Sequence, residues 1–530
     1  MKKWIQLACI AAFFGILAAS LLCSDFAGGK VSETQKRTLA AFPELRGEGM
    51  TLGRFTGEFE TWAGDNIGFA PQYNRLYTAF TAKTLGIMPN DKVFFGRDGF
   101  YYLTANHNVE IGKAAYFPDE DQLRVFAENQ QHLSDSYKAQ NRAYYLVLVP
   151  SKASVYPEYI KGGRFTVTET YNDVVEAYLL AHTDVRVINL KPALVDAKAN
   201  GQVFLRTDTH WTPYGCSVAC REIMDRLLAD GAVERAAALD FDFTQTASID
   251  GDLAAMIGAD ALEREEYRRA VWDRSVRVDT DSALAAGVRK LLDRLDDDST
   301  LMITRDECAF RSDSADANPK TLLLYGDSLY RNTDARPISA MLAENFATTQ
   351  YVRMRTVSQE LDTLVDPDVV IYSSFERMAE TELRNEPAVM AEVSVPTDLS
   401  ALRPLPKQTA DISIGDGGLW VGGAANGVIT LDSRQTRYLI NGWAIDYRER
   451  ADLAGLLVYA DDTQLYCHYG LPAQDVREHF GIDTLRNCRF KFFLYQDYLK
   501  ANNVQTLKFV LLSADGVSYY EPIVYRIAYK

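Results

Sequence analysis

Apolar runs of strand length alternate with helical stretches through the middle of this 530-residue chain. The strand-like runs lie at 143–149, 185–190, 321–325, 351–357 and 368–372, and the helical patterns lie near 119–140, 213–230, 338–346 and 376–384. Strands that alternate with helices form a largely parallel sheet that is covered on both faces, with functional residues at the carboxyl ends of the strands. The alternation therefore predicts an α/β domain.

Two segments depart from this alternation. The aromatic runs 93–95 and 100–102 flank the turn residues 96–99, which predicts a β-hairpin before the first parallel strand. Segment 240–318 carries charge-rich helical pieces, and its acidic run 296–298 is interpreted as a solvated loop and not as a calcium site.

A change of composition near 390–410 predicts a domain boundary, because prolines there are spaced through polar sequence. Beyond it, short strand-like runs and an Asp515-Gly516 turn predict a small all-β sandwich. The expected organisation is an N-terminal segment, an α/β domain, a linker and a β-sandwich at 1–29, 30–390, 391–409 and 410–530 respectively.

The N-terminal segment resembles a membrane anchor. Lys2 and Lys3 precede the uncharged run 4–23, which is long enough to cross about 30 Å of hydrocarbon as a helix with its basic flank in the cytoplasm. We favour an uncleaved anchor; a signal peptide cleaved after residues 18–20 and a buried soluble helix are the alternatives. With an anchor or a signal peptide, the rest of the chain is extracytoplasmic, at the cell surface or in the periplasm.

Composition excludes several classes of protein. A hydrophobic fraction of 47% and a charged fraction of 24% indicate a globular chain. Acidic residues outnumber basic ones 72 to 56, and the net charge of −16 argues against a nucleic-acid binder. Seven cysteines are too few for a disulfide scaffold. Cys216 and Cys220 are expected to be buried thiols, whereas Cys467 and Cys488, in predicted strands, could pair.

Two motifs carry candidate chemistry. The first is an apolar strand that runs into Gly326-Asp327-Ser328, where the serine hydroxyl and its backbone N–H are expected at a turn. The second is the Asp208-Thr209-His210 segment after the apolar run 203–205. Residues two apart in extended chain share a side, so Asp208 could orient His210 as a general base. Taken singly, each motif also fits a structural turn or a structural Asp/His pair.

Together the motifs resemble the SGNH-hydrolase-like domain of the AlgX- and AlgJ-type alginate O-acetyltransferases and the related DHHW proteins. Asp-Thr-His-Trp-Thr stands at 208–212, upstream of Gly-Asp-Ser at 326–328. Further similar segments follow in the family's order, at 37–43, 94–100, 149–152, 366–371 and 376–377. The resemblance covers about 31–385.

The resemblance implies acetyl transfer through an acetyl-serine. Ser328 would be the nucleophile, His210 the general base and Asp208 the residue that orients it. The acceptor would be a polysaccharide, and a multispanning membrane O-acyltransferase would supply the acetyl group, with no metal or cofactor. The family's phenylalanine after Gly-Asp-Ser is Leu329 here, and its arginine after the Asp-Asn-x-Gly-Phe segment is Ala70. Neither change touches the three catalytic candidates.

Several assignments stay open. Arg331, Asn332 and Lys152 are candidates for binding substrate or the oxyanion, although solvated or structural roles fit them as well. The same three catalytic residues would also serve a carbohydrate acetyl-esterase, and a catalytically silent glycan-binding or assembly protein is a further alternative.

The C-terminal region has a weaker resemblance of its own. Segments 440–446, 468–471 and 475–477 are similar to a β-sandwich module that is appended to bacterial surface-glycan enzymes. The aromatic residues Trp420, Trp443 and Tyr466 could stack on sugar rings, and core packing explains them equally well. The module is therefore a candidate for carbohydrate binding or docking.

Overall fold

The computed structural model describes residues 2–529 with gaps. The residues outside the description are 27–30, 33–36, 44–50, 70–71, 74–75, 78–79, 82–90, 164–165, 238, 258–263, 296–306, 355–356, 379–388, 391–396, 407–409, 417–426 and 434–436. The acidic run 296–298, Ala70, Trp420 and most of the helix predicted at 376–384 lie outside the described residues.

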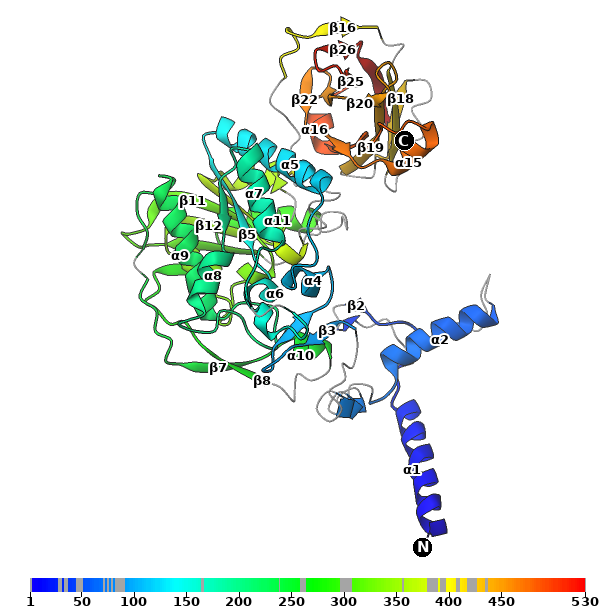
Figure 1. The fold of residues 1–530 in the computed structure, drawn as a ribbon, viewed down its shortest axis with the longest axis vertical. Helices are drawn as coiled ribbons and strands as arrows, with labels where there is room; N and C mark the ends of the chain where they lie inside the picture. Colours follow the sequence, from blue (N-terminus) through cyan, green and yellow to red (C-terminus); the bar gives the residue numbers. More distant parts are fainter. Residues whose placement is uncertain are drawn as a thin grey trace.

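A seven-stranded sheet forms the centre of the first large domain, with the order β6-β5-β14-β11-β12-β10-β9. Figure 1 labels its strands β5, β11 and β12. Its strands are β5 Ala143–Val149, β6 Val187–Asn189, β9 Val276–Val278, β10 Glu307–Ser312, β11 Asn318–Tyr325, β12 Phe346–Val352 and β14 Val369–Phe375. The strands from β6 to β12 in this order pair in parallel. The predicted α/β domain with a largely parallel sheet is therefore confirmed.

Helices cover both faces of this sheet, which explains why its central strands are apolar throughout. On one face lie α6 Lys152–Val155, α8 Lys191–Ala197, α9 Pro213–Ala229 and α12 Ile338–Ala343. On the other lie α5 Glu120–Ala139, α7 Tyr171–His182, α11 Ala283–Leu295 and α13 Gln359–Val365. Every residue of β14 is buried, as expected for a strand between two helical layers.

Local sequence signals set several of these elements. Asp119 and Gln122 form a reciprocal capping box at the start of α5. Thr212 caps α9 by accepting the N–H of Gly215 at 3.1 Å, and Pro213 occupies its first turn. The predicted hairpin is also present, with β3 Val93–Phe95 paired antiparallel to β4 Tyr101–Leu103.

The segment 240–318 differs from the prediction, because it adds strands as well as helix. β7 Thr246–Asp250 pairs antiparallel with β8 Arg264–Arg268 as a separate hairpin. β9 and β10 then extend the main sheet antiparallel beyond β12. In β8 exposed and buried residues alternate as in a strand, with Glu265 and Tyr267 on the buried face. Because the segment is rich in charged residues, this alternation was not recognised as a strand in the sequence.

The C-terminal region consists of two β-sheets that share one core. One sheet has the order β16-β26-β25-β21-β22, with β27 and β18 attached, and the other has the order β17-β19-β24-β23, with β20 attached. Their bounds are β16 Arg403–Leu405, β17 Ala410–Asp416, β18 Val428–Leu431, β19 Arg437–Asp446, β20 Ala451–Asp452, β21 Gly455–Ala460, β22 Thr463–Leu465, β23 His468–Leu471, β24 Arg489–Tyr495, β25 Thr506–Leu512, β26 Ser518–Tyr520 and β27 Ile523–Tyr529. Apolar side chains from both sheets pack together, as in a sandwich. β16, from the segment predicted as a linker, pairs with β26.

Tyr466 docks this region onto the α/β domain. Its hydroxyl donates to Oδ1 of Asn129 at 2.8 Å, and its ring stacks on His132 of α5 with centroids 4.2 Å apart. Arg124, also on α5, donates to the carbonyl of Gly470 at 3.1 Å. Tyr466 is thus an interdomain contact, which favours the packing role over the sugar stacking also considered for it. Trp443 packs edge-on against Phe480, with centroids 5.0 Å apart.

The cysteines of the described chain are unpaired. Cys216 and Cys220 are buried free thiols, as predicted. Cys467 and Cys488 are also free, so the disulfide considered for them does not form in this structure. Both residues lie just outside β23 and β24, and not in the strands where the sequence predicted them.

The N-terminal run forms the helix α1 Lys2–Leu22, followed by α2 Leu52–Asn66, and both project from the sheet domain (Figure 1). Many large apolar side chains of α1 are exposed, among them Trp4 and Phe14. In the part of the chain that the structure covers, no helix reaches the combined length and hydropathy of a membrane span. The membrane anchor therefore stays a prediction.

Candidate active site

Ser328 lies directly after β11, at the carboxyl edge of the parallel sheet. Asp327 caps the short 3-10 helix Ser328–Tyr330 by accepting the N–H of Leu329 at 2.8 Å. Tyr351, at the end of the neighbouring β12, donates its hydroxyl to the carbonyl of Asp327 at 2.7 Å. A side chain at Gly326 would meet the ring of Tyr330 at 2.9 Å, so glycine is required for this sharp exit from the strand. Ser328 itself is half-buried.

His210 lies on a loop that closes on itself. The N–H of Leu205 donates to the carbonyl of His210 at 3.0 Å, and Phe204 forms an isolated antiparallel bridge with Trp211. Trp211 is fully buried, which anchors the returning arm of the loop in the core. This closure presents His210 and Asp208 together at the loop's tip.

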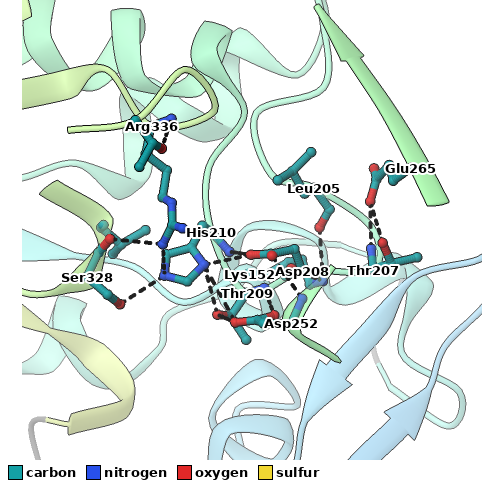
Figure 2. Close-up of polar contacts among 12 residues, drawn as sticks. Lys152, Leu205, Thr207, Asp208, Thr209, His210, Asp252, Glu265, Ser328 and Arg336 are labelled. Carbon is teal, nitrogen blue, oxygen red and sulfur yellow. Dashed lines mark hydrogen bonds and ion pairs between the residues drawn. The ribbon is translucent and has the colours of Figure 1, made fainter. Parts of the chain in front are cut away.

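Asp208, His210 and Ser328 form a continuous hydrogen-bonded chain (Figure 2). Nδ1 of His210 lies 2.6 Å from Oδ1 of Asp208, and Nε2 lies 2.9 Å from Oγ of Ser328. Because a carboxylate only accepts hydrogen bonds, the proton of the first contact belongs to Nδ1 and Nε2 keeps its lone pair. A base in this state can take the proton of the serine hydroxyl.

Asp208 is buried, and both of its oxygens are bonded. Oδ1 also accepts the backbone N–H of His210 at 2.9 Å, and Oδ2 accepts the backbone N–H of Asp252 at 2.9 Å. Burial by itself raises the pKa of Asp208, but the hydrogen bond and charge of His210, with the backbone donors, outweigh it and hold the pKa well below its ordinary value. Asp208 is therefore ionised at neutral pH.

Lys152 holds the loop from behind. Its ammonium donates to the carbonyls of Leu205, Arg206 and Asp208 at 3.0, 2.7 and 2.8 Å. Burial lowers the pKa of Lys152 to about 8, so the side chain keeps its three donors at neutral pH. All three are directed to the backbone. Lys152 thus acts as a clamp for the loop, in place of the substrate or oxyanion contact considered for it.

Two carboxylates complete this support. Glu265 of β8 accepts the backbone N–H groups of Arg206 and Thr207, each at 2.8 Å. Glu376, after β14, accepts the N–H of Ser151 at 2.9 Å and so fixes the start of α6, which carries Lys152. The hairpin β7–β8 and the end of the sheet therefore both contribute to the position of His210.

Asp252 is a second acidic side chain beside the imidazole. Its Oδ2 lies 3.6 Å from Nδ1 of His210 and accepts the hydroxyl of Thr209 at 2.5 Å, while Oδ1 accepts the N–H of Thr209 at 2.7 Å. Asp208, His210 and Asp252 present potential ligand atoms within 4.8 Å of one another, a spacing at which a small cation could bind. The hydrogen bonds among Asp208, Thr209, His210 and Asp252 already explain why these side chains lie close together.

Arg336 is the basic side chain that reaches the catalytic groups. Its Nη1 lies 3.0 Å from Nε2 of His210 and 3.3 Å from the carbonyl oxygen of Ser328. Arg331 is exposed. The side chain of Asn332 hydrogen-bonds to Cys308. Burial raises the pKa of that thiol, and the Asn332 contact offsets only part of the rise. Of the two arginines that follow Gly-Asp-Ser, Arg336 lies against His210 and Ser328, and the substrate or oxyanion role considered for Arg331 stays a prediction.

Sequence reasoning missed Arg336, Asp252 and Glu265. Each reaches the site from another element: the turn before α12, the start of the short helix Asp252–Met256, and β8. Asp252 follows Gly251, where a side chain would lie 2.2 Å from the carbonyl of Thr207. An obligatory glycine next to an aspartate is the one local signal that could have drawn attention to this segment.

Comparison with known proteins supports the family predicted from the motifs. Residues 93–303 match the model of the "SGNH hydrolase-like domain, acetyltransferase AlgX". A "Probable alginate O-acetylase AlgJ" from Pseudomonas putida is 36% identical over 129 residues, which are 22% of this chain and 31% of that protein. The protein of the same name from Pseudomonas syringae pv. tomato is 28% identical over 173 residues, 29% of this chain and 42% of that protein. The resemblance to this family is thus confirmed, although the match spans less than half of these relatives.

The solved structures that align with this chain are distant. The O-acetyltransferase domain of Pseudomonas putida AlgJ aligns with a TM-score of 0.36 at 19% identity, over 54% of this chain and 91% of that domain. Pseudomonas aeruginosa AlgX aligns with a TM-score of 0.35 at 12% identity, over 76% of this chain and 90% of AlgX.

Proposed function

We propose that this protein, whose residues 93–303 match the model of the AlgX-type SGNH hydrolase-like acetyltransferase domain, transfers acetyl groups onto hydroxyls of a polysaccharide. Two of the relatives carry the name "Probable alginate O-acetylase AlgJ", and that name motivates the choice of acceptor class. The observation that carries the proposal is the hydrogen-bonded chain from Asp208 through His210 to Ser328.

In the first half-reaction, Oγ of Ser328 attacks the carbonyl carbon of the acetyl donor while Nε2 of His210 takes the hydroxyl proton. The carbonyl electron pair moves onto oxygen, then returns to expel the donor's leaving group, which receives the proton from Nε2. Asp208 stabilises the imidazolium that exists between these two proton transfers. The product is an acetyl ester on Ser328.

In the second half-reaction, a sugar hydroxyl attacks the acetyl-serine and gives its proton to Nε2 of His210. A second tetrahedral intermediate collapses, Oγ of Ser328 leaves and recovers the proton, and the acetyl group stays on the sugar. Neither half-reaction needs a metal or an organic cofactor. Attack by water in place of the sugar would give the esterase reaction.

The proposal includes a place for the reaction. The apolar run of α1 would anchor the chain in the membrane and put the catalytic domain outside the cytoplasm. Because a soluble acetyl thioester is a cytoplasmic donor, a multispanning membrane O-acyltransferase would supply the acetyl group from within. The C-terminal sandwich would bind the glycan or dock the partner.

The test is the intact mass of the full chain after brief exposure to 4-nitrophenyl acetate. Wild type should gain a single acetyl group on Ser328, and Ser328→Ala and His210→Ala should not. Ser400→Ala and His182→Ala, both at exposed positions, are the matched controls and should acetylate normally. Equal behaviour of all five proteins would contradict the proposal.

A polysaccharide acceptor then separates transfer from hydrolysis. Addition of an oligosaccharide with free hydroxyls should speed the loss of the acetyl-serine and yield acetylated sugar. Release of acetate alone, at a rate that the oligosaccharide leaves unchanged, would favour the esterase. In cells, we expect Ser328→Ala to remove acetylation of the glycan. If the protein were instead a catalytically silent assembly protein, Ser328→Ala would leave that acetylation intact.

A further inference from the structure

The contacts of Arg336 are those of a group that serves the reaction and not the fold. Its guanidinium and Ser328 approach the same ring nitrogen of His210, while Asp208 and Asp252 lie at the opposite edge of the ring (Figure 2). Among the ion pairs of the described residues, none joins Arg336 to a carboxylate. Its Nε is buried and has no hydrogen-bond partner in the described structure.

The two donors at Nε2 compete for one lone pair. A neutral imidazole that donates from Nδ1 has a single acceptor position on Nε2. Ser328 Oγ lies 2.9 Å from it and Arg336 Nη1 lies 3.0 Å from it. When Ser328 donates its proton to Nε2, that nitrogen becomes a donor, and the guanidinium loses its acceptor there. Proton transfer therefore releases an N–H of Arg336 beside the nucleophile.

At that moment a new acceptor forms close by. The attack of Oγ turns the acetyl carbonyl oxygen into an oxyanion on a carbon that is bonded directly to Oγ. An oxyanion needs preorganised donors, and a positively charged donor is worth more than a neutral one. The backbone N–H of Ser328 is one donor of this kind, and Nη1 of Arg336 lies 3.3 Å from the carbonyl of the same residue.

The backbone of Arg336 is held tightly. Thr333 and Arg336 form an isolated antiparallel bridge, with their N–H groups 3.2 and 2.9 Å from each other's carbonyl oxygens. Pro337 and the buried Ile338 follow at the start of α12. This tight turn fixes the root of the side chain, so that only the guanidinium has to move.

We infer that Arg336 is a catalytic residue that supplies a charged hydrogen bond to the oxyanion of both tetrahedral intermediates. When Nε2 of His210 takes the proton of the serine or of the sugar, the guanidinium of Arg336 gives up its hydrogen bond to Nε2. The same N–H of Arg336 then donates to the oxyanion. When each intermediate collapses, Nε2 loses its proton and Arg336 returns. This inference rests on the proposed acetyl-serine reaction.

The kinetic test compares wild type, Arg336→Gln and Arg226→Gln in the full chain. The burst of 4-nitrophenolate measures acetylation of Ser328, and the decay of the acetylated mass measures its loss. Arg336→Gln should slow both steps by about 10²–10³-fold with little change in KM, the size of effect seen when an oxyanion donor is removed. Arg226, an exposed arginine of α9 paired with Asp230 at 3.0 Å, is the matched control and should behave as wild type.

A second measurement uses wild type alone, which covers the case in which Arg336→Gln does not fold. Ser328 is converted by an alkyl 4-nitrophenyl phosphonate to a stable adduct, whose non-bridging oxygen takes the place of the oxyanion. A crystal structure of this adduct should place a guanidinium nitrogen of Arg336 within about 3.2 Å of that oxygen and away from Nε2.

The outcomes separate the two proposals. If wild type forms no acetyl-serine or phosphonate adduct, the proposed function fails. If wild type reacts but Arg336→Gln keeps both rates within a factor of three, the role of Arg336 is overturned. The same conclusion follows if Arg336 in the adduct stays on His210 or faces solvent.

Discussion

The backbone N–H of Asp252 bonds to Oδ2 of Asp208 at 2.9 Å, across 44 residues of sequence. Asp208 needs this second donor because its other oxygen is occupied by His210. A carboxylate held at both oxygens cannot rotate, so it fixes the plane of the imidazole as well as its tautomer.

Replacement of Asp208 by asparagine should nearly abolish activity. If the NH₂ of the asparagine faces His210, it opposes the N–H of Nδ1. If the NH₂ faces the other way, it opposes the backbone N–H of Asp252. In both orientations two donors face each other. We expect acetylation of Ser328 to slow by about 10⁴-fold, as for the equivalent change in a serine protease triad. The burst of 4-nitrophenolate measures this rate.

Asp250→Asn is the control for this change, because Asp250 lies on the nearby hairpin and is half exposed beside Arg264. It should acetylate at the wild-type rate. A folded Asp208→Asn protein with more than a tenth of wild-type activity would contradict the orienting role.

Replacement of Gly251 by alanine should damage the site without touching a catalytic side chain. The added Cβ would lie 2.2 Å from the carbonyl of Thr207 and 2.5 Å from its Oγ1, so the backbone must shift and carry the N–H of Asp252 away from Asp208. We expect a loss of about 1–3 kcal/mol in the free energy of unfolding and a fall in acetylation rate. Urea unfolding and the nitrophenolate burst measure the two effects.

Gly57→Ala is the matched change, since nothing lies within 4 Å of a Cβ at this position of α2. It should leave the acetylation rate unchanged and should not destabilise the protein. Wild-type activity in Gly251→Ala would show that the Asp252 contact is dispensable.

Replacement of Lys152 by methionine should loosen the catalytic loop. Methionine fills a similar volume but leaves the carbonyls of Leu205, Arg206 and Asp208 buried without their donor. We expect a loss of about 2–4 kcal/mol in the free energy of unfolding, together with a lower acetylation rate. Urea unfolding measures the first, and Lys161→Met, at an exposed position, should change neither.

If Lys152 instead bound the acceptor, its replacement would raise the KM for the oligosaccharide and leave the stability unchanged. The unfolding measurement therefore distinguishes a clamp from a substrate contact.

Asp362 should make the stability of the α/β domain depend on pH. Its carboxyl accepts the hydroxyls of Tyr325 and Tyr137 at 2.7 and 2.8 Å, and burial raises its pKa to about 6. Because the folded protein binds this proton more tightly than the unfolded chain, the contribution is complete below the ordinary pKa and is lost as pH rises through about 6. The loss is of the order of 3 kcal/mol.

Asp362→Asn should remove this part of the pH dependence, since an amide does not ionise. Urea unfolding of both proteins between pH 4 and 8 should show the difference between them shrinking toward low pH. Asp366→Asn, at an exposed carboxyl paired with Arg142, is the control and should follow wild type. Parallel stability curves for Asp362→Asn and wild type would contradict the assignment.

The parallel strands were predictable because each is a local apolar run of strand length. β5 was predicted with its bounds, and β11 and β14 within a few residues. β12 begins at Phe346, ahead of the run 351–357 that was predicted for it. Errors occurred where burial depends on partners far away in sequence. β8 alternates exposed and buried positions, but one of the buried residues is the charged Glu265, so only the pairing with β7 reveals the segment as a strand.

The sequence by itself determined which residues are the candidates for catalysis. Asp208 and His210 are two residues apart, and Ser328 follows a strand and a glycine, so local geometry alone brings the first two together and exposes the third. The tertiary structure decided what surrounds them. Arg336, Asp252 and Lys152 come from separate elements. Tertiary packing places Arg336 on His210, Asp252 against Asp208 and Lys152 against the backbone of the catalytic loop. Such contacts between distant segments leave no period or spacing in the sequence.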